Sequence, residues 1–297
     1  MRYQDIPRNS LTRFKPRGDH PPMRCLIVAD LHYSLPQYDW LVAQAPNYDL
    51  LIIAGDHIDL SSAVDGRAQI VVINKYLDLI REKTRVVTCS GNHDLDGRDE
   101  QGEKTSRWIT ELNARGLEAD DVSIEIDGTL ISLCRWWDGP KAQARLAEQL
   151  ARDAAKPKTQ WFWVHHAPIA DSPVSWSGSK FIGDTVLKGW VDQYQPDAVF
   201  SGHIHQSPFT GAGSWADRIG KTWVFNVGQH PGAPPAHMIF DTDENEILWL
   251  SMIGAQSVNL SEPLVRPIPP LRAPPDWFTS GSQARGRTLA RNPGLAD

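Results

Sequence analysis

The sequence predicts an α/β fold that contains two layers of strands. Short apolar runs alternate with segments of helical spacing through the first half of the chain. This alternation is typical of parallel strands joined by right-handed helical crossovers. Asp127-Gly128, placed between two β-rich runs, indicates an antiparallel hairpin, and further strand pairs follow near the end of the sequence.

Each predicted strand is an apolar or β-branched run, and each predicted helix repeats apolar residues every three to four positions. The segment 68–83 shows this helical spacing, and Pro140 stands where a first helical turn accepts proline. The predicted strands are 24–29, 49–54, 85–89, 122–126, 129–134, 160–164, 197–200, 222–226, 237–241 and 247–252. The predicted helices are 37–44, 68–83, 104–115, 141–155 and 184–194.

Composition divides the chain into three parts. Residues 1–22 are polar and contain Arg and Pro without a periodic pattern, which predicts an N-terminal arm. Residues 23–256 carry the strands and helices and form the predicted domain. Residues 257–297 are rich in Pro and Arg and lose periodicity, so we expect a mobile C-terminal extension.

Charge and cysteine content exclude several classes of protein. A net charge of -6 over 297 residues argues against binding of duplex nucleic acid, because proteins bind it mainly through clustered Lys and Arg. Cys25, Cys89 and Cys134 each lie in an apolar run, which predicts buried free thiols. The sequence has no secretory h-region and no apolar run of membrane-spanning length. We therefore expect a soluble cytoplasmic protein that is not bound to a membrane.

Five predicted strands end in polar motifs. Seven of the ten His residues lie in these motifs, and the carboxyl ends of parallel strands are where open sheets bind ligands. The motifs are Asp30-Leu31-His32, Gly55-Asp56-His57-Ile58-Asp59, Gly91-Asn92-His93-Asp94, His165-His166 and Gly202-His203-Ile204-His205. Each motif alone is readily explained as a polar turn. Together they supply only oxygen and imidazole donors, in a number sufficient for two metal ions.

These motifs, in this order, resemble the calcineurin-like metallophosphoesterases over about residues 23–255. The resemblance implies a four-layer α/β/β/α sandwich with a two-metal site at the carboxyl ends of the strands. It implies that one metal ion is held by Asp30, His32, Asp56 and His205. It implies that the second is held by Asp56, Asn92, His165 and His203.

The resemblance also implies a reaction. Two divalent ions, either Mn, Fe or Zn, would polarise a phosphoryl oxygen and supply a bridging hydroxide for attack on phosphorus. His93 would act as the acid at the leaving oxygen, and Asp94 would set the tautomer of His93.

Two positions leave alternatives open. His165 and His166 compete for one ligand position, and we favour His165 because it directly follows the apolar run. His57 stands where the family more often has an apolar or aromatic residue, and it is either a hydrogen-bond partner of the ligands or a packed core histidine.

Departures from the family pattern narrow the substrate class. Leu60 and Ser90 occupy places where phosphoprotein phosphatases carry a pair of Arg residues, and Asp59 stands where purple acid phosphatases carry a metal-binding Tyr. The resemblance that remains is to bacterial phosphodiesterases, including those that act on cyclic nucleotides and glycerophosphodiesters. The alternatives are a nuclease of the same fold, a phosphomonoesterase and a non-catalytic metal-binding scaffold.

Aromatic residues are candidates for contacting the substrate. Trp137 and Trp176 lie in predicted loops beyond strand ends, where either could stack on a base or close the pocket. The loop 168–183 contains Trp176, Lys180 and Phe181 among Ser and Gly residues, and we expect it to form a wall of the substrate site.

Overall fold

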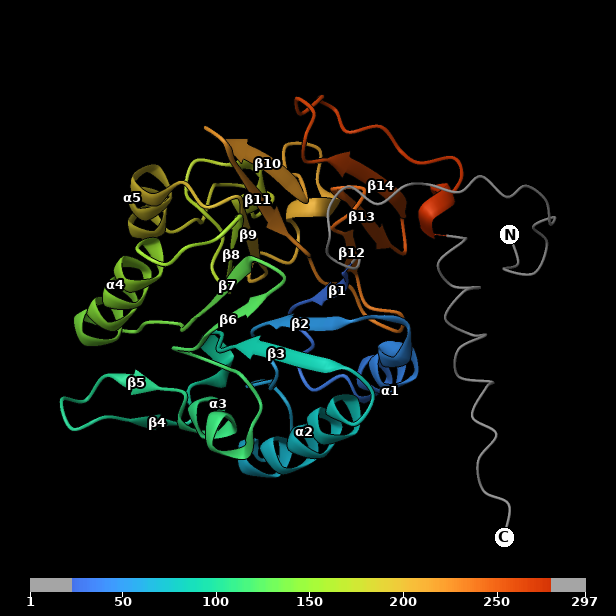
Figure 1. Ribbon diagram of the computed structural model, residues 1–297. Coiled ribbons are helices and arrows are strands. Elements are labelled where there is room, and N and C mark those ends of the chain that lie inside the picture. The colour runs from blue at the N-terminus through green and yellow to red at the C-terminus, as the bar shows by residue number, and fades with distance from the viewer. Residues whose placement is uncertain (1–22, 279–297) are drawn as a thin grey trace, which may run out of the picture.

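Two six-stranded sheets form the centre of the molecule (Figure 1). The computed structural model describes residues 23–278. The first sheet has the strand order β14 (Gly254–Asn259), β13 (Glu246–Ser251), β12 (His237–Asp241), β1 (Arg24–Val28), β2 (Leu50–Ala54) and β3 (Arg85–Cys89). The second has the order β10 (Ala216–Ile219), β11 (Thr222–Asn226), β9 (Ala198–Ser201), β8 (Gln160–His165), β7 (Thr129–Cys134) and β6 (Ser123–Ile126).

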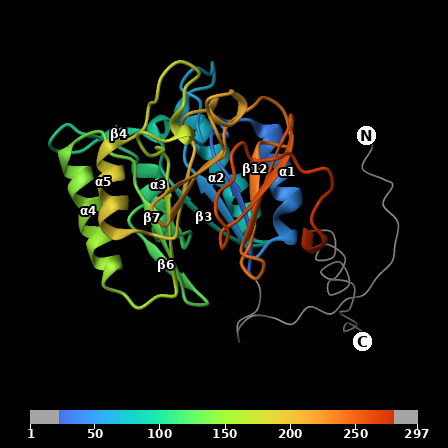
Figure 2. The ribbon, with the colours of Figure 1, turned by 90° about the horizontal axis from the view of Figure 1, so that it is seen from above.

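Helices cover the outer face of each sheet, which confirms the predicted α/β/β/α order of layers. Figure 2 shows α4 and α5 on one side of the paired sheets and α1 on the other. The helices of the first sheet are α1 (Leu35–Gln44), α2 (Gly66–Arg81) and α3 (Arg107–Leu112). Those of the second sheet are α4 (Pro140–Ala154) and α5 (Thr185–Tyr194).

Alternation along each strand divides the core into layers. In β1, Ile27 packs between the two sheets, whereas Leu26 and Val28 pack against the helices of the first sheet. In β8, Phe162 lies between the sheets and Trp163 faces α4 and α5. Successive side chains of a strand point to opposite faces, so strands buried on both faces read as continuous apolar runs.

Parallel pairing places several strand ends at the same edge of the molecule. Strands β1, β2 and β3 run parallel to one another, as do β7, β8 and β9. The crossovers through helices α1, α2 and α4 follow from this direction, because a parallel partner must begin at the opposite edge. The loops that follow these strands therefore lie together.

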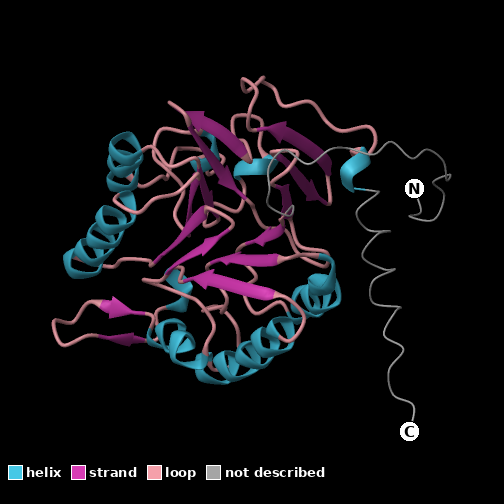
Figure 3. Cartoon of the chain, in the orientation of Figure 1, coloured by secondary structure: helices cyan, strands magenta, loops and turns pink. Residues whose placement is uncertain are grey.

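Several elements differ from the prediction. The expected helix at 104–115 is divided into strand β5 (Lys104–Thr105), helix α3 and a 3-10 turn, because β5 pairs with β4 (Gly97–Arg98) in a projecting hairpin (Figure 3). Strand β10 has no counterpart in the prediction; its four residues pair with β11 across a two-residue turn that contains Gly220 at φ +60°. Neither segment is long enough to show a clear period.

The expected domain boundary at residue 256 falls inside β14. Beyond that strand, Ile268 is buried in the core between the sheets, and Trp277 and Phe278 pack beside the helices of the first sheet. Arg24 binds this segment through a hydrogen bond from its guanidinium to the Trp277 carbonyl (2.8 Å). Isolated apolar residues of this proline-rich segment make the packing contacts. They show no periodic pattern from which the packing could have been predicted. The predicted arm at 1–22 and residues 279–297 lie outside the described part of the chain.

Two further predictions concern the cysteines and membrane-spanning segments. Cys25, Cys89 and Cys134 are buried and unpaired, as predicted. Among the described residues, no helix is both long and apolar enough to span a membrane.

Packing of the C-terminal segment predicts a measurable stability difference. Ile268→Ala should lower the free energy of unfolding by about 2–5 kcal/mol, because it removes methyl groups from a packed interior. Val265→Ala is the matched control, since Val265 is 66% exposed and should change stability by no more than about 0.5 kcal/mol. Denaturant unfolding followed by circular dichroism measures both. Equal, small effects would contradict packing of this segment on the domain.

Candidate metal centre

The polar motifs of the sequence come together where the two sheets meet. Asp30 and Asp56 follow β1 and β2 of the first sheet, whereas His166 and His203 follow β8 and β9 of the second. The backbone at Asp30, Asp56 and His203 is left-handed, with φ of 55°, 56° and 70°. A non-glycine residue in this conformation costs of order 1–3 kcal/mol and marks a functional constraint. The chain turns sharply at each of these residues, directly after the strand.

Glycines beside the ligand candidates leave room for the carboxylates. A Cβ atom at Gly91 would lie 2.1 Å from Asp56 Oδ1, and one at Gly202 would lie 2.3 Å from Asp30 Oδ2. No side chain fits at either position, so the Gly of the Gly-Asn-His-Asp and Gly-His-x-His motifs is required by close packing. The predicted motifs thus have a steric explanation as well as a chemical one.

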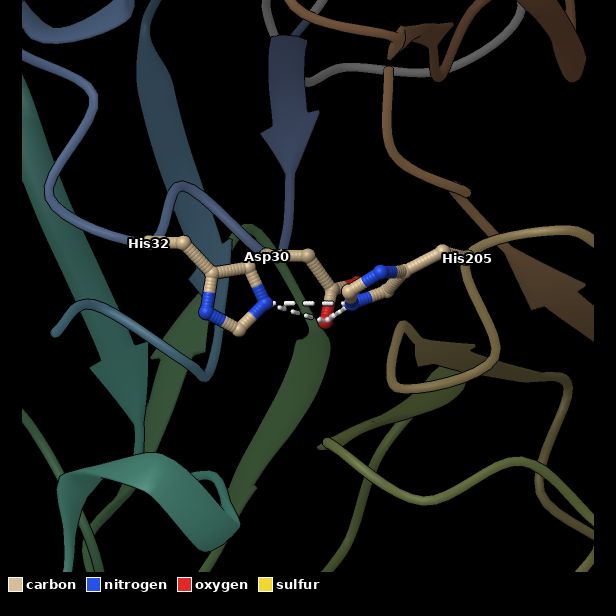
Figure 4. Close-up of side chains that lie close together, drawn as sticks. All are labelled: Asp30, His32 and His205. Carbon is tan, nitrogen blue, oxygen red and sulfur yellow. Dashed lines mark hydrogen bonds and ion pairs between the residues drawn. The ribbon is translucent and has the colours of Figure 1, made fainter. Parts of the chain in front are cut away.

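One group of ligand atoms surrounds Asp30. His205 Nε2 lies 3.2 Å from Asp30 Oδ1, and His32 Nε2 lies 3.7 Å from the same oxygen. The two imidazole nitrogens are 3.0 Å apart (Figure 4). Three donors at such distances, two from the residues after β1 and one from the loop after β9, can face one metal ion.

A second group surrounds Asp56. Its Oδ2 lies 3.1 Å from His166 Nε2 and 3.8 Å from His32 Nε2. Asp56, His166 and His203 have ligand atoms within 4.8 Å of one another, and Asp56 also shares a group with His32 and His93. Asp56 is therefore shared by two of the groups of candidate ligands.

The structure brings His166, and not His165, to the carboxylates. His165 ends β8 on the same face as Trp161 and Trp163, and its ring stacks on Trp137 with centroids 4.8 Å apart. His166 continues the face of β8 that points to the first sheet. The preference for His165 placed the ligand one residue too early, and the alternation of the strand, rather than proximity to its end, identifies the residue that faces the site.

Unsatisfied donor and acceptor atoms show that the cluster fits a metal ion. Asn92 Oδ1 is buried and has no hydrogen-bond partner among the described residues, and His166 Nε2 faces Asp56 Oδ2 at 3.1 Å without a well-formed hydrogen bond. Buried polar atoms are rarely left in this condition, and an amide oxygen and an imidazole nitrogen are good metal ligands. His165 Nε2 is also without a partner in residues 23–278, but it lies outside the ligand groups. The donor set contains N and O atoms without thiolate, which suits Mn, Fe or Zn.

Electrostatics in the cluster match a site for cations. Burial opposes ionisation of Asp30, but hydrogen bonds with His205 and His32 outweigh it and lower the pKa of Asp30 below its usual value. Burial disfavours a charged ring at His166, yet the charge of Asp56 outweighs this effect and raises the pKa of His166 to about 9. Burial, aided by His166, lowers the pKa of His203 to about 4. The proton on His166 thus balances the buried carboxylates, a role that a metal ion takes over when it binds.

Asp94 holds the backbone of the metal-binding loop. Its Oδ2 accepts hydrogen bonds from the N–H groups of Asp56 and Gly91, each at 2.9 Å. Its Oδ1 accepts from the N–H groups of His57 (2.9 Å) and Ile58 (3.3 Å). These hydrogen bonds go to backbone rather than to the His93 ring, so they do not support the prediction that Asp94 sets the tautomer of His93. Both oxygens are engaged by backbone, and Asp94 fixes the position of Asp56.

His93 is oriented by other groups. Its N–H donates to Asp56 Oδ1 (2.9 Å), and its Nδ1 accepts from the N–H of Leu60 (3.4 Å). This contact leaves the proton of a neutral ring on Nε2, which lies 3.9 Å from Asp56 Oδ2. His93 thus points a donor nitrogen toward the site from a half-buried position.

His57 is a packed core histidine with both nitrogens satisfied. Tyr38 Oη lies 2.9 Å from its Nδ1, and Thr88 Oγ1 lies 2.7 Å from its Nε2. Burial lowers the pKa of His57 to about 3, so the ring is neutral. His57 is adjacent to Asp56 in the chain, but it belongs to none of the groups of candidate metal ligands among the described residues.

Two stacked sheets that bring carboxylates and imidazoles together at one edge define an α/β/β/α protein with a candidate metal site. The chain belongs to the calcineurin-like phosphoesterase family, since residues 23–207, more than half of the chain, match the sequence model of that family. The family depends on divalent metal ions, and the cluster of Asp and His residues here is able to bind metal.

Comparison with solved structures gives matches at low sequence identity. Purple acid phosphatase PPD1 from yellow lupin seeds is 13% identical, with a TM-score of 0.50 over 82% of this chain and 52% of that chain. The protein TT1561 of Thermus thermophilus is 13% identical (TM-score 0.48, 81% of this chain, 100% of that chain). The phosphoesterase Yfce from E. coli is 17% identical (TM-score 0.38, 80% and 100%). No match to this chain is found among curated proteins.

Metal content should distinguish the two adjacent histidines. His166→Ala should reduce the number of metal ions retained per chain, because it removes a nitrogen that faces Asp56. His165→Ala is the matched control and should keep the metal content of the unmodified protein. Elemental analysis after dialysis against Mn measures both variants. Loss of metal in the His165 variant alone would restore the original preference.

Asp94 should matter for the stability of the protein, because it holds the loop that carries Asp56. Asp94→Asn should lower the free energy of unfolding of the metal-free protein by about 2–4 kcal/mol, because an amide cannot accept from four backbone N–H groups. His93→Ala should change it by less than about 1 kcal/mol, since this side chain is only half-buried. Urea unfolding compares the two. An unchanged stability in Asp94→Asn would show that the carboxylate does not hold the loop.

Proposed function

We propose that this protein is a phosphodiesterase that hydrolyses small phosphodiesters with two bound divalent metal ions. The observation that carries the proposal is that Asp56 belongs to two groups of candidate ligand atoms, one with His32 and His93 and one with His166 and His203. The first ion would be held by Asp30, His32, Asp56 and His205. The second would be held by Asp56, Asn92, His166 and His203. When bound, two such ions polarise a phosphoryl oxygen and lower the pKa of a coordinated water.

Local charge supports a monoanionic substrate. The overall charge of the protein is negative, so attraction for a phosphate ester must arise in the site itself. Two dications against the carboxylates of Asp30 and Asp56 and one hydroxide would leave roughly one net positive charge, which matches a diester with one negative charge. The positions where phosphoprotein phosphatases carry Arg hold Leu60, whose side chain is 64% exposed, and Ser90, which is buried. Neither supplies the bidentate cation that a dianionic monoester uses.

His93 is the residue that we assign to the leaving group. Its Nε2 carries the proton, because Nδ1 accepts from Leu60, and Nε2 faces the same carboxylate oxygen as His32 and His166 do. A donor in this position can protonate, or hydrogen bond to, an oxygen that departs from phosphorus. Small diesters are the expected partners, duplex nucleic acid is not, and the cytoplasm remains the expected compartment.

A turnover screen tests the assignment. With Mn added, bis(p-nitrophenyl) phosphate and cyclic nucleotides should be hydrolysed faster than p-nitrophenyl phosphate, because the site lacks the Arg pair. A faster monoester rate would indicate a phosphomonoesterase. Preferred cleavage of single-stranded DNA would indicate a nuclease, and metal binding without turnover of any ester would indicate a scaffold.

Dependence on the leaving group tests His93. His93→Ala should cost about 10²- to 10⁴-fold with an alkyl or nucleoside leaving group and much less with p-nitrophenolate, which departs without a proton. The rate constants kcat for two diesters that differ only in that group give the comparison, and metal content should stay intact. Equal losses on both diesters would remove His93 from this role.

A further inference from the structure

Trp136 stands beside the ligand histidines of the second sheet. The centroid of its ring lies 5.2 Å from that of His203, 5.7 Å from that of His166 and 6.4 Å from that of His165, to which the ring is nearly parallel. No ring contact joins it to His32, His93 or His205 among the described residues, whereas His32 and His93 are in contact with each other (4.6 Å). Trp136 therefore borders the half of the centre away from His93.

The position of Trp136 is fixed relative to the Gly-Asn-His-Asp motif. The backbone N–H of Trp136 donates to Ser90 Oγ (3.0 Å), and Ser90 Oγ donates to the buried carboxylate of Asp120 (2.6 Å). On the preceding residue, Arg135 forms an ion pair with Asp121. Ser90 directly precedes Gly91, so the loop after β7 and the loop after β3 are joined at the site. These bonds hold the backbone of Trp136, and the ring contacts with His166 and His203 restrict its side chain. A side chain that is already restricted loses little entropy when a ligand binds to it.

The Trp136 side chain is available for a ligand. It is only partly buried, and its indole N–H has no hydrogen-bond partner in residues 23–278. The two tryptophans favoured from the sequence are engaged elsewhere. Trp137 stacks on His165 and contacts Trp190 (5.5 Å), and Trp176 packs edge-on against Phe181 (4.9 Å). A half-exposed indole beside a polar centre, with one free donor, is the arrangement that aromatic binding walls use.

We propose that Trp136 is a substrate-contacting wall that binds a flat ring on the group that remains attached to phosphorus. This proposal rests on the proposed phosphodiesterase function. His93 lies on the side where the leaving oxygen departs, so the retained group lies toward His166, His203 and Trp136. The substrate class is then a diester whose retained alcohol is a nucleoside or another aromatic alcohol. Stacking of a base on an aromatic side chain is tolerant of sequence and contributes on the scale of about 5- to 150-fold in affinity.

The test varies the retained group while it keeps the leaving group constant. Thymidine 5′-(p-nitrophenyl phosphate) and ethyl p-nitrophenyl phosphate both release p-nitrophenolate, so His93 contributes little to either. Trp136→Ala should lower kcat/KM for the thymidine ester by about 5- to 150-fold, mainly through KM, and for the ethyl ester by less than about 3-fold. Trp136→Phe should retain most of the preference, because it keeps a ring. Trp137→Phe is the matched neighbouring control and should leave the ratio of the two substrates unchanged.

Two other outcomes would contradict the proposed contact between Trp136 and the retained group of the substrate. Equal losses on both esters in Trp136→Ala, with lowered metal content, would show that the ring only positions His166 and His203. An unchanged ratio in both Trp136 variants would show that the ring does not meet the retained group.

The experiments distinguish failure of the proposed phosphodiesterase function from failure of the proposed substrate contact with Trp136. If the unmodified protein hydrolyses neither ester, the proposed function fails. Calorimetric binding of thymidine 5′-monophosphate and ethyl phosphate to the Mn-loaded protein then tests the wall separately. Tighter binding of the nucleotide that is lost in Trp136→Ala would support it, and equal binding of the two ligands would refute it.

Discussion

Two carboxylates, those of Asp30 and Asp56, are buried at the edge where the two sheets meet, with exposed fractions of 0% and 1%. Burial of an ionised carboxylate is costly unless cations or hydrogen-bond donors compensate it. Histidines from both sheets surround these two groups, and the family to which the chain belongs places divalent metal ions in such a cluster. The need to surround two buried negative charges explains why so many loops converge on this edge.

The carboxylates also organise backbone across the interface between the sheets. Asp30, on the first sheet, accepts from the N–H of His203 after a strand of the second sheet, at 2.9 Å to Oδ2. Asp56 accepts from the N–H of His93 (2.9 Å). These bonds offset part of the cost of the left-handed backbone at Asp30, Asp56 and His203. The same His203 N–H also lies 3.1 Å from Asp30 Oδ1, whereas Asp56 separates its partners, with backbone on Oδ1 and the His166 nitrogen at Oδ2.

Two residues outside the ligand set, Asp94 and Ser90, make contacts that differ from the roles expected from the sequence. Asp94 gives both oxygens to backbone N–H groups of the loop that carries Asp56. Ser90, where a phosphate-binding Arg stands in phosphoprotein phosphatases, joins the loop of Trp136 to that of His93. The absence of a charge at this position is accompanied by an aromatic side chain held at the border of the site. Both features suit a substrate with one negative charge and a flat group.

The sequence by itself determined the α/β class, most strand and helix positions, and the residues Asp30, His32, Asp56, Asn92, His203 and His205 that follow the strands. It could do so because apolar period and strand-end polarity are local properties of the chain. Only the tertiary structure decided which of His165 and His166 faces the carboxylates, since both follow the same strand and the face depends on where the other sheet lies. The same holds for Asp94, Trp136 and Ile268, whose partners are distant in sequence. Their roles follow from the packing of two sheets and a C-terminal segment, which no local pattern encodes.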